Sequence, residues 1–123
     1  MMSVKNITLD NNIVSHIYER AGLTGDTFID PRAAITICAL EGGNKCSDIR
    51  VINNIVAGAS YAGFIIMGHD CGNYNQDIFK NNIAHSIEGY KGGMGAVIYP
   101  DPMKSSHSTC FEGSYFTAYK CKL

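Results

Sequence analysis

The sequence predicts an all-β protein, folded as a right-handed parallel β-helix of about four incomplete rungs in a single domain that covers residues 1–123. Three observations predict this fold. The chain repeats nearly the same word three times, a short apolar run follows each copy, and no segment has the apolar spacing of an amphipathic helix. The connections also lack the helix of about 10 to 15 residues that a doubly wound α/β fold needs.

The repeated word is NNIV at residues 11–14 and 53–56, and NNIA at residues 81–84. Its copies begin 42 and 28 residues apart (53 − 11 and 81 − 53). Two short strands in each irregular period fit rungs whose strands stack while their loops vary in length. The longer first period indicates an insertion loop at about residues 18–32. The apolar runs that follow the words are AAITI, AGFII and MGAVI, starting at Ala33, Ala62 and Met94.

The repetition of asparagine needs a cause, because asparagine is a poor strand former. In a stacked coil the same position of successive rungs recurs about 4.8 Å apart, so stacked amides can hydrogen-bond as a ladder. Asparagine also tolerates the left-handed backbone conformation of a sharp corner. We therefore predict a corner ladder made by Asn11, Asn53 and Asn81, or by their neighbours Asn12, Asn54 and Asn82. The alternative is that the Asn pairs form ordinary turns in an all-β sandwich.

The residues around the Asn pairs predict the core. Ile13, Ile55 and Ile83 are expected to stack as one inward-facing aliphatic column. The apolar runs are expected to form a second wall, with one column of Ile35, Phe64 and Ala96 and another of Ile37, Ile66 and Ile98.

Charge and hydropathy exclude several classes of partner. The chain has 10 basic and 11 acidic residues and a net charge of −1, so it has no electrostatic footprint for nucleic acid or anionic membrane. No apolar run approaches the roughly 18 residues of a membrane span. The first residues, MMSVKNITLDNN, contain neither the basic nor the apolar region of a secretory signal.

The cysteines favour an extracellular location all the same. Several of the five lie in segments rich in Gly, Asn and Asp, as in disulfide-bonded secreted proteins. No CxxC pair exists and the histidines lie outside zinc-ligand spacing, so no structural zinc site is expected. Asn6 in NIT is an expected N-glycosylation site. We predict that Cys71 pairs with Cys110 or Cys46 and that Cys121 lacks a partner within the chain; the disulfide candidates are Cys38, Cys46, Cys71, Cys110 and Cys121.

Acidic and aromatic residues supply the candidate ligand contacts. Asp48, Asp70 and Asp101 are expected in the same inter-strand loop of successive rungs, where they could contact a glycan or a calcium ion. Tyr61 and Tyr90 are suited to stacking on sugar rings. The alternative is that these acidic residues are solvated and serve turns. We expect no catalytic residue and, calcium apart, no cofactor.

Three stretches resemble a known family: NNIVAGASYAGFIIMGHDCG from Asn53, FKNNIAHSIEGYKGGMGAVIYPD from Phe79 and CFEGSYFTAYKC from Cys110. They are similar to the β-helix region of fibrocystin-L and fibrocystin, which are large cell-surface proteins related to cell-surface hyaluronidases. The resemblance covers about residues 32–121. It implies a structural or ligand-binding segment of an extracellular, cell-surface or ciliary coat protein. The alternative is a fragment of a carbohydrate-active, hyaluronan-degrading-like β-helix enzyme.

The two ends of the expected β-helix predict its partners. Bare strand edges pair with other chains, and terminal repeats of solenoids normally need a cap. We therefore expect the end rungs to stack on further β-helix rungs of the same or neighbouring chains, and we expect no stable monomer. Identical neighbours would stack head-to-tail into a filament. Glycans are the other expected partner.

Overall fold

The computed structural model describes residues 3–17, 33–37, 45–67, 77–88, 93–99 and 111–122. This part of the chain is all-β and contains no helix, and therefore no helix that could span a membrane. Its strands are β1 (Ser3–Asp10), β2 (Ile13–Ile17), β3 (Ala33–Ile37), β4 (Lys45–Ile52), β5 (Ile55–Ala59), β6 (Ala62–Met67), β7 (Asp77–Lys80), β8 (Ile83–His85), β9 (Met94–Tyr99), β10 (Phe111–Ser114) and β11 (Thr117–Tyr119).

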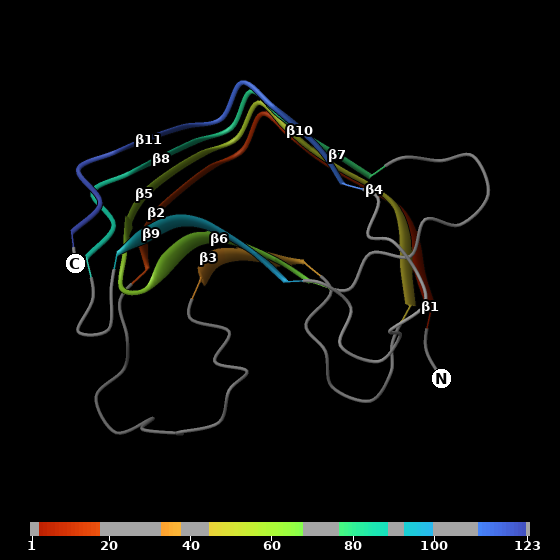
Figure 1. Ribbon diagram of the computed structural model, residues 1–123, viewed down its shortest axis with the longest axis horizontal. Coiled ribbons are helices and arrows are strands. Elements are labelled where there is room, and N and C mark those ends of the chain that lie inside the picture. The colour runs from red at the N-terminus through yellow and green to blue at the C-terminus, as the bar shows by residue number, and fades with distance from the viewer. Residues whose placement is uncertain are drawn as a thin grey trace.

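The strands form three sheets, and every pairing between them is parallel. The sheet orders are β1-β4-β7-β10, β2-β5-β8-β11 and β3-β6-β9, which we call the first, second and third sheets. The chain visits the three sheets in turn, and Figure 1 shows successive visits lying one over another. We call one round through the three sheets a pass. The passes are β1–β3, β4–β6, β7–β9, and β10 with β11. This stack of parallel sheets is compatible with a parallel β-helix.

Each pass that the structure describes to its end contains three strands, whereas the sequence predicted two in each repeat. The additional strand lies in the first sheet and precedes the Asn pair. The expected insertion at residues 18–32 lies outside the described residues.

A sharp corner joins the first sheet to the second in every pass, visible as the stacked kinks between β4 and β5 or β7 and β8 in Figure 1. Asn11, Asn53 and Asn81 occupy this corner with φ of 57°, 58° and 55°. Their backbone N–H groups donate to carbonyl oxygens of the following pass, as Asn53 does to Lys80 at 3.0 Å. Asparagine suits this position because its short polar side chain tolerates the left-handed region.

A second left-handed corner ends the strands of the second sheet. Equivalent positions of the four passes have positive φ, and no two of them are the same residue type: His16 (59°), Gly58 (70°), Ser86 (55°) and Lys120 (51°). No common residue marks this corner, so it could not be predicted from the sequence.

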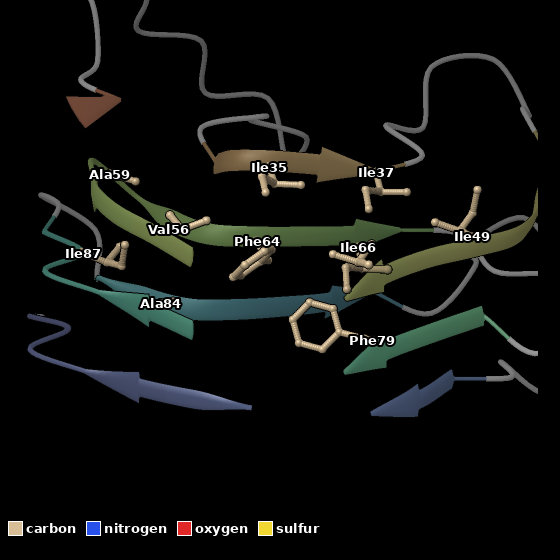
Figure 2. Close-up of a cluster of buried hydrophobic side chains, with 11 residues drawn as sticks. Ile35, Ile37, Ile49, Val56, Ala59, Phe64, Ile66, Phe79, Ala84 and Ile87 are labelled. Carbon is tan, nitrogen blue, oxygen red and sulfur yellow. The ribbon is translucent and has the colours of Figure 1, made fainter. Parts of the chain in front are cut away.

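The core fills the space between the three sheets, as Figure 2 shows for its buried side chains. Ile35, Ile37, Phe64 and Ile66 supply the third sheet's part and are all buried. Their pairings are those the sequence predicted, Ile35 beside Phe64 and Ile37 beside Ile66, with Phe64 beside Ala96 in the next pass.

The predicted Ile column of the second sheet is wrong. Ile13 is 75% exposed, and Ile55 and Ile83 are only half-buried. The inward positions belong to the next residue of each strand, including Val56 and Ala84, which are fully buried. Side chains alternate between the faces of a strand, so an inward-facing residue at the second Asn position turns the following Ile outward.

Two glycines of the third sheet, Gly63 and Gly95, lie close to alanine side chains of the second sheet. A Cβ atom on Gly63 would lie 2.6 Å from the carbonyl oxygen of Gly95 and 2.9 Å from the Cβ of Ala84. A Cβ atom on Gly95 would lie 2.6 Å from the Cβ of Ala118. The glycine at the second position of the second and third apolar runs therefore serves the contact between these two sheets.

Candidate functional site

The second Asn of each pair forms a ladder that runs through three passes. The backbone N–H and the Nδ2 of Asn12 donate to Oδ1 of Asn54, at 3.0 and 2.9 Å. The same two groups of Asn54 donate to Oδ1 of Asn82, both at 3.0 Å. We call this the inner ladder; within it every donor belongs to the earlier pass and every acceptor to the later one.

The inner ladder is also tied to the first sheet. Nδ2 of Asn54 donates to the carbonyl oxygens of Leu9 and Ile52, at 3.0 and 2.9 Å, and Nδ2 of Asn82 donates to that of Val51 at 2.8 Å. Asn54 and Asn82 are fully buried. Burial of an amide is tolerated only where its polar atoms find partners, and here the ladder and the carbonyl groups supply them.

The first Asn of each pair contributes to a second, exposed column. Nδ2 of Asn81 donates to Oδ1 of Asn53 at 3.2 Å, and Nδ2 of Asn53 donates to Oδ1 of Asp10 at 2.9 Å. We call this the outer ladder. Its donors belong to the later pass, so it runs in the opposite direction to the inner ladder.

The N-terminal end of the stack, formed by β1, β2 and β3, leaves the inner ladder unfinished, whereas the outer ladder ends on Asp10. Asn11 and Asn12 are exposed, and no described residue donates to Oδ1 of Asn12. Beside them lie the exposed apolar side chains of Ile13 and Ile17. Within the described ranges, the three strands pair on one side only, with β4, β5 and β6.

The C-terminal end is chemically different, because Tyr115 and Phe116 take the places of the Asn pair. Tyr115 has the left-handed φ of 53° at the corner, and Phe116 corresponds to Asn82 in register. Phe116 offers no side-chain amide, so the inner ladder stops at Asn82. Its ring instead packs against the rings of Phe79 and Phe64, with centroids 5.4 and 6.2 Å away. Although it lies in the last pass, Phe116 is only 37% exposed and covers the aromatic part of the core.

Aromatic side chains also mark the outer surface of this end. Tyr119 stacks on His85 with ring centroids 4.9 Å apart and planes 9° from parallel. Nζ of Lys80 lies 5.8 Å from the centre of the Tyr115 ring, which is 75% exposed. These contacts tie the fourth pass to the third on the face that points away from the core.

The predicted ligand contacts do not assemble into one site in the described part of the chain. Asp48 lies within β4 rather than in a loop, and Tyr61 is half-buried against Ala62 and Ile65. Asp70, Tyr90 and Asp101 lie outside the described residues. Among the described residues, no group of three or more His, Cys, Asp or Glu could hold a metal ion.

Two of the cysteines and the sequon are placed by the structure. Cys46 lies in β4, paired in register with Val4. Cys121 has a free, half-buried thiol that packs against the core. Asn6 is exposed and has φ of 57° within β1. Cys38, Cys71 and Cys110 lie outside the described residues, so their pairing stays a prediction.

The fourth corner, at Tyr115 and Phe116, was not among the positions predicted from the sequence. The sequence did contain a signal for this corner, because the pair Tyr115 and Phe116 is followed by the short β-forming run TAY. Asp10, which completes the outer ladder, gave no signal because it lies outside the repeated word.

The fold and the ladders define a class: an all-β protein of stacked parallel sheets, with one asparagine-rich end and one aromatic end. Comparison of the chain with models of protein families, with curated proteins and with solved structures finds no match.

Proposed function

We propose that the chain is a scaffold: a segment of right-handed parallel β-helix that works by stacking on further parallel β-structure. Its partners are rungs of the same or neighbouring polypeptides, and stacking of identical copies would run head-to-tail. The proposed setting is an extracellular, cell-surface or ciliary coat protein similar to fibrocystin-L.

The unfinished N-terminal end carries this proposal. Asn12 is exposed there, whereas the corresponding Asn54 and Asn82 are buried and are covered by a preceding pass as well as a following one. Ile13 extends the row of Ile55 and Ile83 with three quarters of its surface exposed. A strand edge with open backbone groups and exposed apolar side chains is a template for pairing with another strand.

The extracellular setting rests on the sequence. The sequon at Asn6 would lie on an exposed residue, as glycan attachment requires. The cysteine content and the resemblance to fibrocystin-L favour the same location. We also propose that glycans bind to the molecule by stacking on its exposed tyrosine side chains.

Sedimentation velocity of the purified full chain, over a range of concentrations, tests the scaffold role. We expect association that increases with concentration, because end strands pair with those of other copies. A monodisperse monomer over the whole range, with a single cooperative thermal transition, would contradict the proposal. Non-reducing peptide mapping tests the location: five free thiols would argue against an extracellular protein.

A further inference from the structure

The two ends of the stack present different hydrogen-bonding side chains, and this difference determines which partner each end can bind. At the N-terminal end, no described residue donates to Oδ1 of Asn12. Asn11 stands at the corner position that Asn53 and Asn81 occupy in the outer ladder, and its exposed side-chain amide can donate to a partner. A matching strand pair must therefore supply two donors at one corner position and one acceptor at the residue before it.

An Asn-Asn corner supplies this set, as the stack itself demonstrates. Where the second pass meets the third, the backbone N–H and Nδ2 of Asn54 donate to Oδ1 of Asn82. At the same contact Oδ1 of Asn53 accepts from Nδ2 of Asn81. The two ladders run in opposite directions, so a partner must match both, and it must approach in the same parallel register.

The C-terminal end of a second copy matches only in part. Its backbone N–H at Phe116 could reach Oδ1 of Asn12, but Phe116 has no side-chain amide for the inner ladder. Tyr115 likewise has no amide oxygen for the outer ladder. The Asn pairs of the second and third passes are covered by neighbouring passes on both sides. A copy of this chain therefore presents no Asn-Asn corner that is free to donate.

We propose that the N-terminal end of the stack binds a partner polypeptide whose strand–corner–strand segment carries Asn-Asn at the corner, in preference to the aromatic end of another copy. The inference rests on the proposed stacking role and names the partner's chemistry. Hydrogen bonds from Asn11 and to Oδ1 of Asn12 would make binding depend on the residues at the partner's corner. Backbone pairing along β1 and β2 would supply the part of the affinity that does not depend on sequence. Phe116 makes the other end chemically different and so gives the stack a direction.

A binding experiment with synthetic peptides tests this inference on the full chain. The probe is a labelled peptide that copies residues 49–59, which contains the second pass's corner, and its affinity is measured by fluorescence anisotropy. Three variants serve as controls: N54A, N53G, which keeps the left-handed corner, and a peptide with Tyr-Phe in place of Asn-Asn. We expect the N54A and Tyr-Phe peptides to bind roughly tenfold more weakly, the loss expected for the missing amide hydrogen bonds.

The chain variant N12A completes a double-mutant cycle. Asn12 is exposed, so the variant is expected to fold, which circular dichroism checks. We expect N12A to bind the Asn-Asn peptide at least as weakly as the wild-type chain binds the N54A peptide, because N12A removes the acceptor of both hydrogen bonds, and to be insensitive to the N54A change. Equal binding of the Asn-Asn and Tyr-Phe peptides would overturn the inference and leave the stacking role intact. Failure of every peptide to bind would also overturn it, while sedimentation decides the scaffold role separately.

Discussion

Two asparagines with the same sequence context have different energetic roles, because one is buried and the other is exposed. Asn54 is fully buried and holds hydrogen bonds to Asn12, Asn82 and two carbonyl groups of the first sheet. Asn12 makes its ladder contact from an exposed position. A buried polar group that loses its partner keeps the full cost of desolvation, whereas an exposed one turns to water.

We predict from this difference that N54A lowers the free energy of unfolding by about 2–4 kcal/mol, since it leaves several buried polar atoms without partners. The matched variant N12A is expected to cost less than about 1 kcal/mol, because water replaces the lost contacts. Urea unfolding of both variants at equal concentration measures the difference. Equal losses for the two would mean that the inner ladder does not hold the stack together.

The ladder could be predicted from the sequence because identical residues recurred at the same place before similar words. The direction in which the neighbouring Ile side chains point could not be predicted, because it depends on which Asn of each pair turns inward. The structure gives the left-handed corner to the first Asn and the buried position to the second. A shift of one residue exchanges the two faces of a strand, and so the predicted column of Ile13, Ile55 and Ile83 lies on the outer face.

At the scale of the elements, the distance between the second and third sheets depends on side-chain size. Gly63 lies opposite Val56 and Ala84, and Gly95 lies opposite Ala118. Neither glycine has a positive φ, so contact rather than backbone conformation is the reason for glycine here. The close approach lets the sheets bury their small side chains without a cavity.

We predict that G63A lowers the free energy of unfolding by about 1–3 kcal/mol, because the new methyl group would overlap the Gly95 carbonyl oxygen and the Ala84 side chain. The control is G113A in β10, at an exposed strand position, where the change is expected to stay within about 0.5 kcal/mol. Denaturant midpoints compare the two variants. A G63A variant as stable as the wild type would contradict the close contact of the sheets.

Elements of the third sheet could be predicted in correct register because each begins with small residues and continues with aliphatic ones. The strands of the first sheet could not be recognised as a repeat. These strands point Ile49, Val51 and Phe79 into the core. Their outward-facing residues differ from pass to pass: Asp10, Ile52 and Lys80 occupy the same register position. Only pairing in space relates these strands.

For the whole molecule, stacking is the source of stability and, as we propose, of function. Each pass buries its neighbour's inward side chains and completes its hydrogen bonds, so an end pass is stabilised from one side only. The aromatic end compensates with Phe116 over the core, while the asparagine-rich end keeps exposed ladder groups. The central claim is that this end accepts a further parallel pass.

The most direct measurement of this claim is hydrogen exchange in an extended chain. A second copy of residues 45–76, which follow one another from β4 to the start of β7, is placed directly ahead of Ser3. The new pass would offer its Asn-Asn corner to Asn11 and Asn12, and the control carries N54A in the added copy alone. We predict that backbone amides of β1 and β2 that face away from β4 and β5 exchange at least about tenfold more slowly than in the original chain, and that the control shows less protection. Exchange at unchanged rates in the extended chain would contradict the claim that the N-terminal end is built to receive another pass.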